Sequence, residues 1–194
     1  MTMSNIIRIL SLALPLSGVL AAPSSAAVGG YIIPGDGLPS LESLGLTKED
    51  LFDPDFLVKR GIVPVSPFNS TLQDRDGLGK RAVRYCTTGP PAEVASVSAC
   101  VNYLNSIGNN ACTAPRSRIR MCIAQAPGNI YPAAIYGTAE CNNQDSSACR
   151  DVASIGQQVI DQCNFFWMNT PRWVAMGGDA ARGNGCLQID VLGA

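Results

Sequence analysis

Histidine is absent from this chain of 194 residues. Without imidazole, the chain has no Ser-His or Cys-His catalytic pair, no histidine-ligated metal and no histidine pH switch. An excess of charge of one sign is absent as well, because 14 basic and 15 acidic residues leave a net charge of −1. Nucleic-acid-binding proteins usually carry a basic surplus that displaces counterions. We therefore expect no nucleic-acid partner.

Apolar runs long enough to span a bilayer are also missing. The run over residues 9–20 is shorter than the roughly 18–20 apolar residues that a spanning helix needs. It follows Arg8 and ends in small residues, which is the pattern of an export signal cleaved between Ala21 and Ala26. We expect residues 1–26 to be a signal peptide, and the product to be secreted, extracellular and not stably inserted in a membrane.

Cysteine is missing from residues 1–81, and all eight cysteines lie in residues 82–194. In a secreted domain this density predicts disulfide bonds rather than metal ligands, so we expect four bonds, no metal and no cofactor. The sequence leaves the pairing open. The eight residues are Cys86, Cys100, Cys112, Cys122, Cys141, Cys149, Cys163 and Cys186.

Residues 27–81 contain many prolines and glycines and eight of the fifteen acidic residues. This composition predicts a mostly disordered propeptide, with a short helix over residues 48–58. Two dibasic pairs, Lys59-Arg60 and Lys80-Arg81, are typical cutting sites of a subtilisin-like secretory protease. We expect cleavage after Arg81 and a mature domain of residues 82–194. The glycosylation sequon at Asn69 lies in the discarded part.

Two helices are predicted in the cysteine-rich half. Apolar residues recur at helical spacing over Val94–Ile107, and Gly108 ends that helix. The second helix begins near residues 145–147, any of which is a suitable N-cap, and ends at Cys163. Along it Gly156 permits close approach of a neighbour.

Alternating residues predict strands in the remainder of this half. With two helices on one face of a small antiparallel sheet, the expected fold is α+β, a two-layer α/β sandwich stabilised by disulfides. A glycine-rich turn joins the last two strands. The expected strands are 119–123, 133–139, 173–176 and 187–191.

Two groups of residues are candidates for binding. Arg116, Arg118 and Arg120 alternate, so on a strand they form a cationic row suited to phosphate, carboxylate or sulfate groups. The alternative is a solvated, aggregation-resistant strand face. The second group lies in an expected loop and either closes the edge of the core or binds a partner or sugar. It comprises Phe165, Phe166, Trp167, Met168 and Trp173, with Trp167 and Trp173 as the candidate contacts.

A hydrolase without histidine would need a pair of carboxylates, or a nucleophile that needs no separate base. Asp145 with Asp151, or Asp161 with Asp190, are the conceivable pairs. The alternative is that Asp145 caps the second helix, Asp151 lies in its first turn, and the other two are solvated. We expect no catalytic residue.

Several segments of residues 82–194 resemble small secreted fungal effectors of the necrosis-inducing extracellular effector family and, more distantly, the virus-encoded killer toxins of smut fungi. The segments are Cys122, 134–139, Cys141, 146–153, 159–163 and 179–185. The resemblance implies an α/β sandwich and a role as a toxin or effector. The toxins carry basic residues just before the cysteine that Cys122 matches, where Arg116, Arg118 and Arg120 stand here.

The sequence therefore predicts a secreted, proteolytically matured fungal effector or killer-like toxin, a monomer and not an enzyme. It would contribute to virulence or antagonism by binding a target-cell surface or a host protein. Two alternatives remain open: a wall-associated carbohydrate-binding or structural protein that uses Trp167 and Trp173, and a hydrolase that uses paired acids.

Overall fold

A computed structural model describes residues 29–62, 85–86, 89–168 and 170–194. The expected signal peptide, Asn69 and the Lys80-Arg81 pair lie outside these residues. The elements are β1 Tyr31–Pro34, the 3-10 turn η1 Glu42–Leu44, α1 Lys48–Phe52, α2 Phe56–Lys59, β2 Tyr85–Cys86, α3 Val94–Ile107, β3 Ala111–Pro115, β4 Ile119–Gln125, β5 Ala133–Ala139, β6 Gln144–Ala148, α4 Cys149–Cys163, β7 Asn164–Trp167, β8 Arg172–Ala175, β9 Gly177–Ala180 and β10 Leu187–Gly193.

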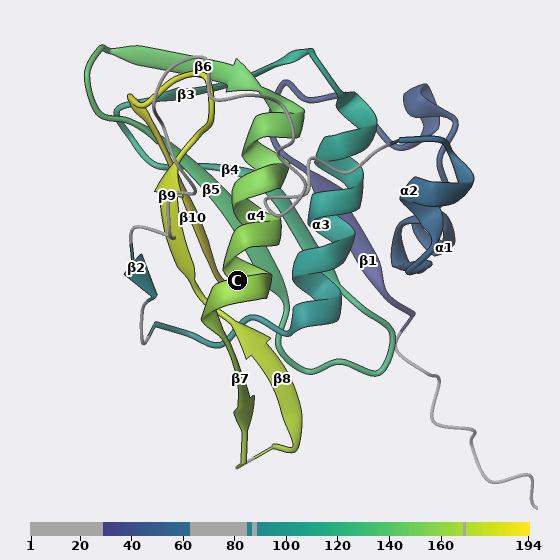
Figure 1. The fold of residues 1–194 in the computed structure, drawn as a ribbon. Coiled ribbons are helices and arrows are strands. Elements are labelled where there is room, and N and C mark those ends of the chain that lie inside the picture. The colour runs from purple at the N-terminus through teal and green to yellow at the C-terminus, as the bar shows by residue number, and fades with distance from the viewer. Residues whose placement is uncertain (1–28, 63–84, 87–88, 169) are drawn as a thin grey trace, which may run out of the picture.

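The main sheet has six antiparallel strands in the order β1-β4-β5-β10-β9-β2. Helices α3 and α4 lie side by side across one face of it (Figure 1). Along β10, Leu187, Ile189 and Val191 are fully buried and Asp190 is half-buried, but Gln188, which the sequence pattern places on the polar face with Asp190, is buried as well. The alternation is therefore only partial here, whereas the α+β class with antiparallel strands is confirmed.

Helix α3 is confirmed at both ends. Glu93 is its N-cap residue, and Gly108 ends it with a φ of 68°, a conformation that glycine adopts without a Cβ penalty. Gly156 of α4 lies against α3, where an added Cβ would come within 2.7 Å of Val101 Cγ2. The predicted close approach of the two helices at Gly156 is therefore confirmed.

The predicted start of α4 is wrong. Residues 144–148 form strand β6, which pairs with β3, and the helix begins at Cys149 with no side-chain cap on Ala148. Serine and aspartate favour a helix N-terminus locally, but here the pairing of β6 with a distant strand determines their conformation.

Two predictions near residue 170 are also wrong. Strand β8, close to the expected 173–176, pairs with β7, which lies in the expected loop. β10 pairs with β5 on one side and with β9 on the other, and β9 lies inside the expected glycine-rich turn. Glycine has low strand propensity, but Gly177 packs where a Cβ would meet Tyr85 O at 2.6 Å, so close backbone approach requires it.

All eight cysteines are paired, as predicted. The bonds tie helices to strands: Cys100 of α3 joins Cys122 of β4, and Cys112 of β3 joins Cys149 of α4, all four residues having no exposed surface. The other two bonds join Cys86 to Cys163 and Cys141 to Cys186.

The expectation that residues 27–81 are disordered is wrong for residues 29–62. β1 is an edge strand of the main sheet, and Leu51 and Phe56 belong to the hydrophobic core. The short helix expected over 48–58 is two helices, separated where extended Asp53 precedes a proline. Composition was a poor guide here because this segment buries its few apolar side chains against another part of the chain.

Candidate functional site

The hairpin of β7 and β8 projects from the end of the main sheet (Figure 1). Among the described residues its two strands pair with each other and with no other strand, apart from one bridge between Val174 and Glu93, in a register that places Phe166 opposite Trp173 and Trp167 opposite Arg172. Aromatic residues have high strand propensity, which favours this local structure. The hairpin therefore lies outside the main sheet, with Val174 and Ala175 of β8 fully buried at its base.

Both faces of the hairpin carry aromatic rings. Side chains two apart on a strand share a face, so Phe165 and Trp167 lie together, with ring centroids 5.7 Å apart. The rings of Phe166 and Trp173 meet edge to face at 5.6 Å. Most of these side chains are open to solvent: Phe165 is 38% exposed, Phe166 48%, Trp173 57% and Met168 87%. Trp173 and Met168, which are more than half exposed, therefore do not close the edge of the core.

Arg172, the first residue of β8, joins the turn end of the hairpin to a neighbouring loop. Its guanidinium donates to Asn129 Oδ1 at 3.2 Å and to Gly128 O at 3.0 Å, and it lies 3.6 Å from Glu93 Oε2. These contacts hold the hairpin in one orientation relative to the loop.

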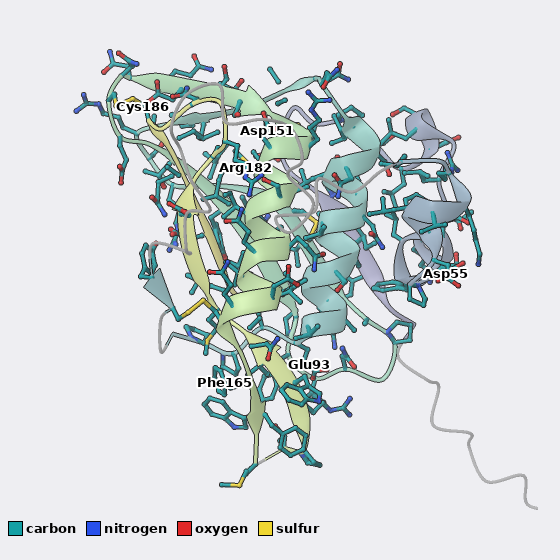
Figure 2. All side chains as sticks on the ribbon, in the orientation of Figure 1. Asp55, Glu93, Asp151, Phe165, Arg182 and Cys186 are labelled. Carbon is teal, nitrogen blue, oxygen red and sulfur yellow. A yellow bond between two sulfur atoms is a disulfide. The ribbon has the colours of Figure 1, made fainter. Side chains whose placement is uncertain are left out.

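Glu93 is the buried part of this anchor, with 3% of its surface exposed (Figure 2). Its Oε1 accepts hydrogen bonds from the backbone N–H of Ile130 at 2.9 Å and of Tyr131 at 3.2 Å. The sequence analysis did not identify this role of Glu93, the residue just before α3. This role could not be predicted from the sequence, because the groups that bind the Glu93 carboxylate are far from it in the chain.

The three arginines do not form the row that alternation predicted. Arg116 follows β3, Arg118 precedes β4, and only Arg120 lies within a strand. Arg116 donates to the carbonyl oxygens of Asn142 at 3.1 Å and Cys141 at 3.3 Å. A turn between two strands thus separates residues that one strand would have aligned.

Arg118 is part of a polar network on the sheet. It forms an ion pair with Asp190 of β10 and lies 4.6 Å above the ring centroid of Tyr136. Tyr85 donates a hydrogen bond to Asp190 as well. Burial, followed by the contact with the Asp190 carboxylate, raises the pKa of Tyr85 to about 12. The side chain of Arg120 is exposed and forms no ion pair or hydrogen bond with any residue that the structure describes.

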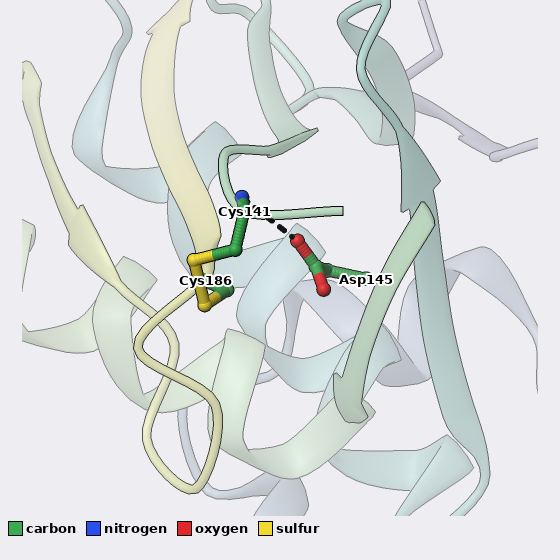
Figure 3. Close-up of side chains that lie close together, drawn as sticks. All are labelled: Cys141, Asp145 and Cys186. Atoms are coloured by element: carbon green, nitrogen blue, oxygen red, sulfur yellow. Dashed lines mark hydrogen bonds between the residues drawn. A yellow bond between two sulfur atoms is a disulfide. The ribbon is translucent and has the colours of Figure 1, made fainter. Parts of the chain in front are cut away.

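Asp145 lies beside the Cys141–Cys186 disulfide (Figure 3). Both sulfur atoms are bonded to each other and are not thiolates, which zinc requires as ligands. The carboxylate instead accepts from the Asn142 side chain at 2.7 Å and from the backbone N–H of Cys141 and Asn142 at 3.3 Å. Asp145 therefore caps this turn, and the prediction that it caps the second helix is wrong.

Replacing Asp145 with asparagine should lower stability at neutral pH but much less in acid. The hydrogen bond from Asn142 and the backbone donors lower the pKa of Asp145 below its ordinary value of 3.8. A lowered pKa in the folded state stabilises the fold above the unfolded pKa, and this contribution disappears as pH falls through the folded pKa. Urea unfolding of both proteins at pH 7 and at about pH 2.5 measures it. An equal difference at both pH values would contradict the assignment.

The acids proposed as catalytic pairs contact other groups. Asp161 on α4 accepts from Gln157 at 2.9 Å, whereas Asp190 on β10 binds Arg118 and Tyr85. The remaining acid, Asp151, lies in the first turn of α4 as expected.

Asp151 lies near Arg150 and Arg182 (Figure 2). Burial raises the pKa of Asp151, and these two arginines oppose the shift. Arg182 also faces the buried Gln158 side chain of α4, and with that amide turned so that its oxygen faces the guanidinium, Arg182 Nε donates to it at 3.2 Å. Arg182, within one of the segments that carry the family resemblance, therefore connects the loop before β10 to α4.

The dibasic pair Lys59-Arg60 is part of the folded N-terminal segment. Lys59 forms an ion pair with Asp53, and Arg60 donates to Gly45 O at 2.9 Å while lying over the ring of Phe56. A protease needs an extended chain in its active site, so these contacts disfavour cutting here.

Comparison with known proteins identifies the family of the cysteine-rich half. Residues 81–193 match the domain of unknown function DUF8794, so the chain belongs to this family. No curated protein and no solved structure matches the chain. In the part of the chain that the structure describes, no helix is long and apolar enough to cross a membrane.

Proposed function

We propose that the protein is a secreted, proteolytically matured effector or killer-like toxin that binds a target-cell surface or a host protein through the β7–β8 hairpin. The observation that carries this proposal is the exposure of aromatic rings on both faces of a projecting hairpin. Apolar groups that remain open to solvent on a folded domain usually mark an interaction site. Aromatic residues also supply most of the energy at protein interfaces.

Secretion and maturation are supported by separate features. All eight cysteines form disulfides, which persist in oxidising compartments outside the cytosol. The family match begins at residue 81, next to the Lys80-Arg81 pair. We propose that cleavage after Arg81 separates residues 82–194, and that these form the two-layer α/β sandwich of the effector family that the sequence resembles.

Adsorption of the purified secreted protein tests this function. Incubation with fungal cells and with plant tissue should remove the protein from solution in a saturable manner. Incubation with insoluble chitin or β-glucan under the same conditions should leave the protein in solution. No loss to any cell would contradict the proposal.

A second candidate is carbohydrate binding, which the exposed Trp173 ring favours because indole faces stack on sugar rings. In that case chitin or β-glucan alone would remove the protein, and soluble oligosaccharides would compete with cells. Release of reducing sugars that is lost in an Asp145 or Asp151 variant would instead indicate a hydrolase.

A further inference from the structure

Residues 29–62 lie against the edge of the cysteine-rich domain. β1 pairs with β4 from Tyr31 opposite Gln125 to Pro34 opposite Cys122, and the backbone N–H of Gly35 continues the contact to Met121 O at 2.8 Å. An added Cβ on Gly35 would meet backbone atoms of residues 120 and 121 at 2.3 to 2.8 Å. The backbone of residues 31–35 therefore approaches the backbone of β4 as closely as neighbouring strands do within a single domain.

The apolar side of this contact is well buried. Leu51 is 0% exposed, Phe56 3% and Leu46 6%, and all three belong to the same core cluster as Tyr103 and Leu104 of α3. Burial of these apolar side chains favours association of the segment with α3. The core thus continues from the cysteine-rich domain into the N-terminal segment.

Two side chains of α3 bind the backbone of the segment directly. The Tyr103 hydroxyl donates to Pro39 O at 2.6 Å, and Asn102 Nδ2 donates to Leu51 O at 2.8 Å. Tyr103 is 0% and Asn102 is 9% exposed, and burial raises the pKa of Tyr103. These donors on α3 are directed at the segment, so its loss would expose them together with the edge of β4.

No covalent bond other than the polypeptide backbone holds the segment. Residues 1–81 contain no cysteine, and all four disulfides lie between Cys86 and Cys186. After cleavage at Arg81, only non-covalent contacts would therefore hold residues 29–62 to the cysteine-rich domain.

We infer that residues 29–62 stay on the cysteine-rich domain after cleavage, as a second chain bound to the edge of β4 and the outer face of α3. The secreted protein is then a two-chain complex in which β1 supplies the sixth strand and protects β4 from pairing with other chains. This inference rests on the proposed function in one respect only, the proposed cleavage after Arg81.

The test makes the cut independently of natural processing. A site for a sequence-specific protease is inserted between residues 63 and 80 of the secreted full chain, the purified protein is cleaved, and its mass is measured under native and denaturing conditions. Denaturing spectra should contain two chains, and native spectra at about micromolar concentration should contain one complex with their summed mass. A separate mass for the cysteine-rich chain in native spectra would overturn the inference.

Culture fluid without the inserted site tests the proposed maturation separately. Denaturing spectra containing residues 82–194 would support cleavage after Arg81. An intact chain would contradict the maturation proposal. It would not affect the experiment with the inserted protease site, in which the cut is made by the added protease.

Variants identify the surface that holds the segment. Leu51→Ala should raise its dissociation constant roughly 30-fold or more, as large-to-small substitutions in a core do. Tyr103→Phe keeps the ring and removes the donor to Pro39 O, so a rise of about 2- to 12-fold is expected even if Leu51→Ala folds poorly. Val58→Ala, at a side chain 76% exposed on α2, is the matched control and should change nothing. Equal retention in all three variants would contradict this binding surface.

Discussion

Replacing Phe166 and Trp173 together with alanine should lower the affinity of the protein for target cells roughly 100-fold or more. These side chains are 48% and 57% exposed and form the edge-to-face pair on one side of the hairpin. Aromatic hot-spot residues typically contribute about 2 kcal/mol or more each when truncated, which is about 30-fold per residue. Adsorption isotherms on the responsive cells measure the change.

Stability should fall much less than binding in this double variant. The lost ring contact is worth about 0.5–1.5 kcal/mol, and little core area is removed. Urea unfolding provides the comparison, and Ile33→Ala is the matched control because Ile33 is a 47% exposed apolar residue on β1 of the main sheet. Unchanged cell binding in a folded Phe166 and Trp173 variant would remove the hairpin from the proposed function.

Replacing Cys112 and Cys149 together with alanine should lower the free energy of unfolding by about 4 kcal/mol. The bond closes a loop with a sequence separation of 37 and joins β3 to the first residue of α4. Its loss frees the unfolded chain, and it also leaves space at two positions that have no exposed surface. Urea unfolding under non-reducing conditions measures the difference.

The Cys141–Cys186 bond is the control for this experiment. Its sequence separation of 45 is similar, but Cys141 is exposed. Its removal should cost the loop entropy without the packing loss, so the Cys112 and Cys149 variant should be the less stable of the two. The reverse order would contradict the assignment of buried packing to the Cys112–Cys149 bond.

The candidate site was partly predictable. The sequence identified the aromatic cluster at residues 165–173 as unusual, because five large apolar side chains in nine positions are conspicuous anywhere. Whether those rings face the core or solvent depends on which strand β7 pairs with, and β7 pairs with β8 alone. The anchoring of Arg172 by Glu93 was not predictable, because the two residues are far apart in the chain.

Local patterns determined the elements whose stabilising contacts repeat along one face. Helix α3 and strands β4, β5 and β10 follow from periodicity, because burial of one face imposes a period on the sequence. The presence of paired cysteines follows from composition.

Contacts between distant residues decided the rest. Residues 144–148 became a strand because β3 supplies the hydrogen-bond partners, although serine and aspartate favour a helix cap. Residues 29–62 folded because α3 and β4 offer an apolar face and a free strand edge, which composition does not reveal. The disulfide pairing depended on the same packing, since a bond forms only where the fold brings two Cα atoms within about 4.4–6.8 Å.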